Sequence, residues 1–273
     1  MSIDASTFDL EVLRDSLTLE FSSAGRSNNE KNPEYWKYGD YEATFERFAW
    51  SGADGWIESD SGETVLRFLP KNKMTIPFYP FATDKRNTGY TIELEIETRD
   101  VADYDAVVVS CKDENGIGFE VKSQSVTFKT ELSKLDMMFK DGERVRITIV
   151  VEPATLNRFI YMFVNGIMVG LTQYESGDNF KQATPMPITI GSDKSGIDLY
   201  KIRFYDRNFT YIEQLNNYIC DRSTNAERFE LKERNDIYDI SGNLTIGSIP
   251  PNIPYMVLQC PELPQFKGDK KKK

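Results

Sequence analysis

The chain has 273 residues, a net charge of −10 and no histidine. The acidic charge argues against a nucleic-acid partner, because phosphate binding is carried mainly by lysine and arginine. The absence of histidine excludes Ser-His-Asp and Cys-His catalysis and every imidazole metal ligand.

The first 40 residues are predicted to be an N-terminal arm or linker. They hold one segment with strand character, Ser16–Phe21, and then a polar run over residues 22–33 that is too poor in apolar side chains to pack a core. Acidic residues stand where a signal peptide has a cationic start, so we expect no export signal. No run of about 18 apolar residues occurs, so we expect no membrane insertion.

Residues 41–205 carry many short segments rich in Val, Ile, Thr and aromatic residues, separated by Gly, Asn and Asp turns. This spacing is typical of a β-sandwich or barrel. No repeat of fixed period is visible, so a propeller or solenoid is not expected. We predict a mainly β fold, an antiparallel jelly-roll β-sandwich, as the main domain of the chain.

The period changes after Asp206. Phe209, Ile212, Leu215 and Ile219 follow helical spacing, which predicts a closing helix at about 210–221. Residues 223–273 are predicted to form a polar helix, a proline-rich connector and a basic tail. We expect both ends of the chain to become ordered by contact with partner subunits, because they bury little apolar surface of their own.

The end of the β region resembles the laminin-G and concanavalin A-like jelly-roll family. There, the last strand has a comparable pattern and leads into a short helix. The residues that carry the resemblance are Leu199, Ile202, Arg203, Phe204, Tyr205, Arg207, Asn208 and Thr210. The resemblance implies a lectin-like sandwich with its closing helix over residues 41–222.

The wider arrangement resembles structural or adhesion proteins of tailed bacteriophages. The polar run before the sandwich, residues 48–57 within it and residues 263–271 behind it carry this likeness. It implies a non-enzymatic virion module, in the tail or as capsid decoration, made in the host cytoplasm and able to bind carbohydrate. The implied partners are virion subunits, other copies of the chain and a host surface glycan.

A run of alternating glutamates is the strongest catalytic candidate. In residues 91–99 the period of two puts Glu93, Glu95 and Glu97 on one face of a strand. Laminarinase-type glycoside hydrolases share the jelly-roll fold, and the resemblance implies a nucleophile at Glu93, a helper at Glu95 and an acid/base at Glu97. The middle residue is Glu where that family has Asp, and no Trp precedes the motif.

The alternative is a strand face whose glutamates pair with Lys or Arg on neighbouring strands, and we favour it. We therefore assign no catalytic residue. A carbohydrate-binding module of a secreted polysaccharide hydrolase is a further alternative with the same fold.

Aromatic side chains in loop-like surroundings are the candidates for carbohydrate binding, because sugars stack on aromatic rings in exposed clefts. The candidates are Trp36, Tyr38, Tyr104 and Tyr174. Packing of a loop over the sandwich is the competing role for each of them. Trp50 and Trp56 are expected in the core.

No metal or cofactor is expected. Four loop aspartates could supply oxygen ligands, but they follow no calcium-loop spacing and fit ordinary turns better: Asp54, Asp60, Asp193 and Asp198. The three cysteines lie far apart and predict buried thiols: Cys111, Cys220 and Cys260.

Overall fold

The computed structural model describes residues 11–59, 62–85 and 87–222. Residues 14–210 form one unit, which holds all of the described strands, and the helix α1 belongs to a second unit. The strands are β1 (Leu17–Ser22), β2 (Lys37–Tyr38), β3 (Tyr41–Glu42), β4 (Thr44–Glu46), β5 (Gly55–Glu58), β6 (Thr64–Phe68), β7 (Lys73–Ile76), β8 (Tyr90–Arg99), β9 (Val107–Lys112), β10 (Gly118–Lys122), β11 (Ser125–Lys129), β12 (Lys134–Met138), β13 (Arg144–Val151), β14 (Phe159–Val164), β15 (Ile167–Gln173), β16 (Ile188–Ile190) and β17 (Gly196–Tyr205).

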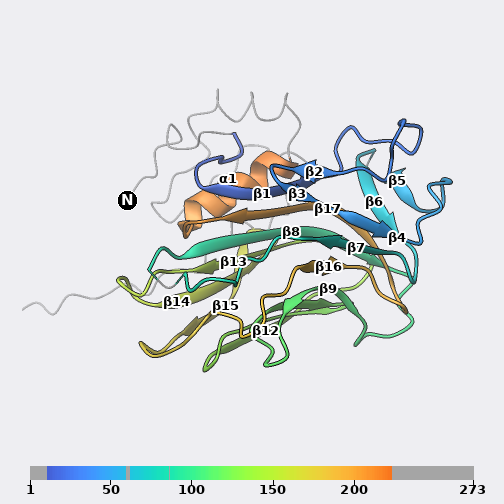
Figure 1. The fold of residues 1–273 in the computed structure, drawn as a ribbon. Helices are drawn as coiled ribbons and strands as arrows, with labels where there is room; N and C mark the ends of the chain where they lie inside the picture. Colours follow the sequence, from blue (N-terminus) through green and yellow to red (C-terminus); the bar gives the residue numbers. More distant parts are fainter. Residues whose placement is uncertain (1–10, 60–61, 86, 223–273) are drawn as a thin grey trace, which may run out of the picture. The chain divides into compact units, whose positions relative to one another are not determined.

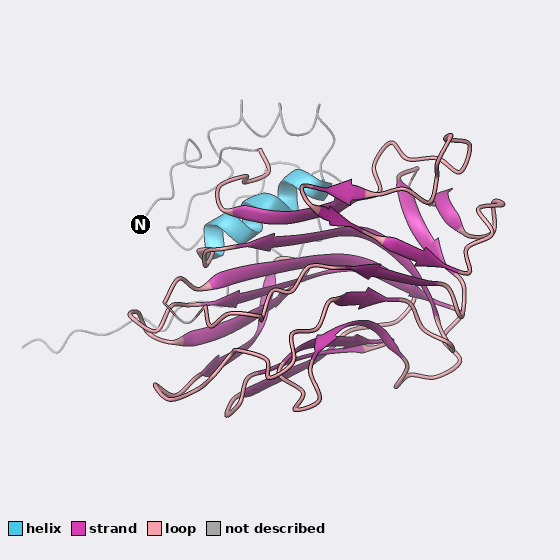
Figure 2. Cartoon of the chain, in the orientation of Figure 1, coloured by secondary structure: helices cyan, strands magenta, loops and turns pink. Residues whose placement is uncertain are grey.

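Two antiparallel sheets form the body of the larger unit (Figures 1 and 2). The eight-stranded sheet has the order β15-β14-β13-β8-β17-β6-β5, and β1 also pairs with β17. The seven-stranded sheet has the order β12-β11-β10-β9-β16-β7-β4. The predicted mainly β class and antiparallel sandwich are confirmed.

The sheets are held together by a core of alternating side chains. In β8, Ile92, Leu94 and Ile96 are buried toward the other sheet, and the neighbouring strands add further aliphatic residues. Aromatic rings bridge the two layers: Phe204 of β17 lies 6.0 Å from Phe119 of β10, measured between ring centroids. Burial of this apolar surface is the main favourable term in folding.

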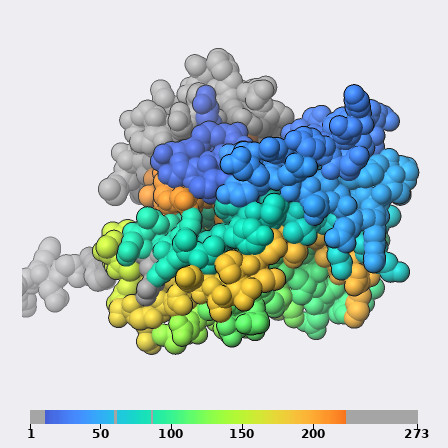
Figure 3. All heavy atoms as spheres, viewed as in Figure 1, coloured from blue at the N-terminus to red at the C-terminus, as the bar shows by residue number. Residues whose placement is uncertain are grey.

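Loops close the space at the ends of the strands. The loop after β7 and the loop before β16 lie side by side at the surface of the unit (Figure 3). There the N–H of Gln182 donates to the carbonyl oxygen of Phe81 at 3.0 Å. A backbone hydrogen bond thus joins two loops that are 101 residues apart in the chain and satisfies a backbone donor of one loop and an acceptor of the other.

The N-terminal strand belongs to the sandwich, which corrects part of the predicted arm. β1 pairs with β17 in antiparallel register, with Phe21 opposite Ile202. Leu19 and Phe21 are fully buried, and the Phe21 ring packs 5.1 Å from that of Trp36. The sandwich therefore begins before residue 41, because two alternating apolar side chains give this short strand a buried face.

The second unit contains the helix α1 (Tyr211–Arg222), close to the bounds predicted for it. Glu213 in the first turn and Arg222 in the last turn suit the helix dipole. Within the same unit, Asn217 Oδ1 accepts a hydrogen bond from the N–H of Leu13 at 2.9 Å. The predicted second helix, proline-rich connector and basic tail lie outside the described residues.

The described cysteines are buried thiols, as predicted for Cys111 and Cys220. Cys111 donates its S–H to the carbonyl oxygen of Met186 at 3.3 Å, and burial raises the pKa of this thiol. Cys260 lies outside the described residues.

The pairing of β1 yields a first prediction. Phe21→Ala should lower the free energy of unfolding by about 3–5 kcal/mol, because it leaves a cavity between Trp36 and Trp56. Urea denaturation measures the loss. Leu132→Ala is the control, since Leu132 is 59% exposed and should change stability by less than about 0.5 kcal/mol. Equal stability of the two variants would mean that β1 is a detachable arm.

Candidate carbohydrate-binding groove

A polar groove lies at one end of strands β7, β9 and β16. It encloses about 490 Å³, which falls in the size range of small-ligand sites. Its polar lining comes from the strands and from the loops before β9 and after β16: Lys73, Thr75, Asp103, Asp105, Thr189, Ser192, Asp193 and Lys194. Carboxylates, hydroxyls and ammonium groups together can accept and donate hydrogen bonds to a polar ligand.

The loop before β9 is held in place by hydrogen bonds from two buried serines. Ser123 and Ser195 direct their hydroxyls at the carbonyl oxygen of Asp103, at 3.1 and 3.4 Å. Both serines are fully buried. The N–H of Asp105 donates to the Asp103 carboxylate at 3.0 Å, which closes a local Asx turn. The loop therefore presents its carboxylates at fixed positions.

Ion pairs set the charge state of the groove. Lys194 Nζ lies 2.7 Å from Asp103 Oδ2, and Lys122 Nζ lies 2.7 Å from Asp105 Oδ1. The hydrogen bond from Lys194, and then that from the N–H of Asp105, lowers the pKa of Asp103. The Asp103 hydrogen bond likewise raises the pKa of Lys194, and the Asp105 hydrogen bond raises that of Lys122. The Asp103–Lys194 pair thus keeps both of its charges at neutral pH.

An exposed aromatic residue lies between the two aspartates in sequence, at the rim of the groove and not in its lining. Tyr104 is 59% exposed, and the residues on either side of it in sequence, Asp103 and Asp105, line the groove. A sugar needs an aromatic plane for its apolar face and carboxylates for its hydroxyls. The segment 103–105 offers both within three residues.

The solved structures similar to this chain include botulinum neurotoxin structures, among them binding domains. The binding domain of botulinum neurotoxin DC in complex with rat synaptotagmin II is 13% identical, with a TM-score of 0.52 over 76% of this chain and 51% of that one. A botulinum neurotoxin type C structure, described as dependent for cell entry on two ganglioside molecules, is 12% identical, with a TM-score of 0.55 over 77% and 52%. The receptor binding domain of botulinum neurotoxin D is 11% identical, with a TM-score of 0.53 over 75% and 52%.

The likeness is one of fold. The chain spans about half the length of these toxin binding domains. No protein-family profile matches the sequence, and no curated protein matches it either. The β-sandwich is therefore a fold used by binding domains, while the activity of this chain depends on its own side chains.

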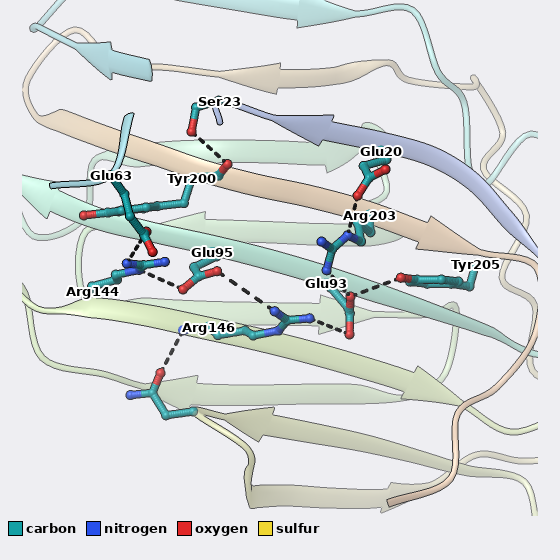
Figure 4. Close-up of polar contacts among 11 residues, drawn as sticks. Glu20, Ser23, Glu63, Glu93, Glu95, Arg144, Arg146, Tyr200, Arg203 and Tyr205 are labelled. Carbon is teal, nitrogen blue, oxygen red and sulfur yellow. Dashed lines mark hydrogen bonds and ion pairs between the residues drawn. The ribbon is translucent and has the colours of Figure 1, made fainter. Parts of the chain in front are cut away.

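The catalytic candidates lie in an ion-pair network on the outer face of the eight-stranded sheet (Figure 4). Glu93 is 2% exposed, with Arg146 at 2.7 Å and Arg203 at 3.4 Å. Glu95 is 1% exposed, with Arg144 Nε at 2.8 Å. The pairing with cationic side chains of neighbouring strands is the arrangement that we favoured from the sequence.

Glu97 lies further along the same face. It contacts Arg99 at 3.1 Å and accepts a hydrogen bond from the Tyr200 hydroxyl at 3.2 Å. Burial, and then the Glu97 charge, raises the pKa of Tyr200 to about 12. Glycoside hydrolysis needs a carboxyl pair beside a site that holds the sugar. Here the carboxylates of Glu93 and Glu95 are buried among guanidinium groups instead.

The four aromatic candidates occupy different environments and are not brought together. Trp36 is 7% exposed and packs in the core, and Tyr38 is half-buried against it. Tyr174 is 1% exposed, and its hydroxyl donates to the carbonyl oxygen of Glu152 at 2.8 Å. Tyr104 is the candidate with an exposed ring, and its sequence neighbours Asp103 and Asp105 line the groove, so it is the candidate that we retain.

Of the charged residues that line the groove, only Asp193 was singled out from the sequence, as a possible calcium ligand. Asp103 and Asp105 flank Tyr104, and an aromatic residue between two carboxylates was the signal available in the sequence. Lys194 lies ninety residues away and only the fold brings it to Asp103. Among the described residues, no group of three or more Cys, Asp or Glu side chains is placed to hold a metal ion.

The aspartates considered for calcium have other partners. Asp54 accepts hydrogen bonds from the N–H groups of Ala49 and Trp50, at 2.9 and 2.8 Å. Asp198 is buried, with Arg67 at 2.8 Å. Asp193 lies 3.5 Å from Lys73, and Asp60 lies outside the described residues.

A second prediction concerns the network. Glu93→Leu should lower the free energy of unfolding by about 3–5 kcal/mol, because it leaves the buried guanidinium of Arg146 without its closest carboxylate. The exposed Glu114→Leu, in the turn after β9, is the matched control and should change stability by less than about 0.5 kcal/mol. Both are read by urea denaturation. Unchanged stability in Glu93→Leu, with β-glucan hydrolysis by the wild type, would restore the catalytic interpretation.

Proposed function

We propose that the chain is a non-catalytic carbohydrate-binding module that recognises its glycan at the groove beside Tyr104. The observation that carries the proposal is the polar groove of about 490 Å³ lined by Asp103 and Asp105, with the exposed Tyr104 between them in sequence. In this proposal Tyr104 stacks on a sugar ring, Asp103 accepts hydrogen bonds from sugar hydroxyls, and Lys194 holds the Asp103 carboxylate in position.

The toxin neighbours support this proposal at the level of fold. One of them is the binding domain of botulinum neurotoxin DC in complex with SialylT, and the type C neurotoxin depends on ganglioside molecules for cell entry. A sandwich of this kind is thus found in proteins that interact with sugars. A glycoside hydrolase is less well supported, since Glu93 and Glu95 are buried in ion pairs.

We also propose that the module works in a virus particle, as a structural or adhesion component that attaches to a host glycan. This setting rests on the resemblance of the sequence to tailed-bacteriophage proteins. Among the described residues, no helix is long and apolar enough to cross a membrane. Mass spectrometry of purified particles from the encoding virus should detect the chain. Its presence in infected cells but absence from particles would contradict the setting.

The groove proposal predicts a specific loss of binding. On a glycan array the wild-type chain should bind at least one glycan, and Tyr104→Ala should weaken that binding about ten-fold, equivalent to about 1.4 kcal/mol. Isothermal titration calorimetry with the bound glycan measures the change. Asp103→Asn should weaken it as well, because it removes a charged acceptor.

Tyr79→Ala is the control, since Tyr79 is 45% exposed and, unlike Tyr104, has no sequence neighbour that lines the groove. It should bind as the wild type does. Equal binding by Tyr104→Ala and Tyr79→Ala would place the site elsewhere, and an array without any bound glycan would refute the proposed function.

A further inference from the structure

The outer face of the seven-stranded sheet carries an unbroken line of polar side chains. The register brings together one residue from each strand, in the order Thr44, Thr75, Thr189, Ser110, Glu120, Thr127 and Asp136. We call this line the hydroxyl row. Strands lie about 4.8 Å apart, so the row is about 29 Å long. Five of its members offer hydroxyl groups.

A row of lysines lies beside it on the same face. Lys112 is opposite Gly118, Gly118 is opposite Lys129, and Lys129 is opposite Lys134. Glycine leaves no side chain between Lys112 and Lys129. With Lys122 and the hydroxyl-row residues Glu120 and Thr127, these lysines line a groove of about 220 Å³. We call it the lysine groove.

The lysine groove keeps an excess of positive charge in an acidic protein. Four lysines line it, and three carboxylates pair with them: Glu120 with Lys112, Asp105 with Lys122 and Asp136 with Lys134. The whole chain has a net charge of −10. Like charges directly opposite each other on a sheet, such as Lys129 and Lys134, destabilise it. The side chains of Lys112 and Lys134 are 39% and 56% exposed, and ion pairs at such exposed positions are weak, so an anionic ligand can compete for these lysines.

The lysine groove is linked to hollows on both sides. Lys122 lies 2.7 Å from Asp105, which lines the groove beside Tyr104. Lys129 also lines a cavity of about 630 Å³ with amide side chains, among them Asn115, Asn179 and Gln182. A polar track thus crosses the sheet, longer than one sugar ring needs.

We propose that this face binds an extended anionic polysaccharide, a chain of sugars that carries carboxylate, sulfate or phosphate groups. The lysine groove takes the anionic groups, and the hydroxyl row takes the sugar hydroxyls. The inference rests on the proposed function, because it names the class of glycan that the module recognises.

The lining favours a polysaccharide over a nucleic acid. No arginine and no exposed aromatic side chain lines the lysine groove, whereas single-stranded nucleic acids are held by stacking of bases on aromatic rings. Charge complementarity with the lysines favours an anionic glycan over a neutral one. The hydroxyl row favours a glycan over an anion that has no hydroxyl groups.

The test uses one glucan with and without charge. Fluorescently labelled dextran sulfate and dextran are titrated with the wild-type chain at about 50 and 200 mM NaCl. Dextran sulfate should bind at least about ten-fold more tightly than dextran at the lower salt, and the preference should shrink at the higher salt.

The double variant Lys129→Gln/Lys134→Gln should lose about ten-fold in affinity for dextran sulfate. Lys31→Gln/Lys37→Gln changes the net charge equally at two exposed lysines outside the lysine groove and should stay within about two-fold of the wild type. Equal losses in the two variants would overturn the inference, as would equal affinity for dextran and dextran sulfate. Tighter binding of a single-stranded DNA oligonucleotide than of dextran sulfate would also overturn it.

The failure of this inference differs from the failure of the proposed function. Binding of a neutral glycan that is lost in Tyr104→Ala and unchanged in Lys129→Gln/Lys134→Gln would overturn the anionic class and leave the module a carbohydrate binder. A glycan array without any bound glycan would overturn the module itself. An unchanged melting temperature in each variant establishes that it is folded.

Discussion

The carboxylates of Glu93 and Glu95 are the groups on which the larger sheet depends. Each is almost completely removed from water, and a buried charge costs several kcal/mol unless it is paired. Arg146 and Arg144 come from β13, and Arg203 comes from β17, so the pairs join β8 to both of its neighbours. A one-residue slip of β8 would turn these carboxylates into the apolar core. The ion pairs therefore specify the register of the central strands.

The two sheets therefore have different roles. On the outer face of the eight-stranded sheet, Glu93 and Glu95 are paired with arginines of neighbouring strands and are buried out of reach of a ligand. The outer face of the seven-stranded sheet has short polar side chains and partly exposed lysines instead, with Ser110 and Lys112 as examples on β9. The larger sheet thus gives the fold its rigidity, and the smaller one offers polar groups to the surroundings.

The sequence alone was sufficient for the features that depend on neighbouring residues. The alternation of Glu93, Glu95 and Glu97 with aliphatic residues predicted a strand with two different faces, and the structure has it as β8. The helical spacing after Asp206 predicted α1 within one residue at each end. Both patterns are local, so no knowledge of the fold was needed.

Features that depend on distant residues could not be predicted in this way. The polar surroundings of Trp36 suggested an exposed loop, yet its ring packs against Phe21 because β1 joins the sheet. The hydroxyl row takes its members from seven strands out of chain order, so it appears only with the register of Thr189 against Ser110. The arginine partners of Glu93 are likewise separated from it by 53 and 110 residues.

The two serines beneath Asp103 have a consequence for how this protein can diverge. They hold the loop through its backbone, at the carbonyl oxygen of Asp103, and not through the exposed side chains of the loop. Substitutions at Tyr104 or Lys194 therefore leave the support of the loop in place. Among descendants of this chain, Ser123 and Ser195 should be retained by selection for folding. Positions 104 and 194 can be substituted as the ligand changes.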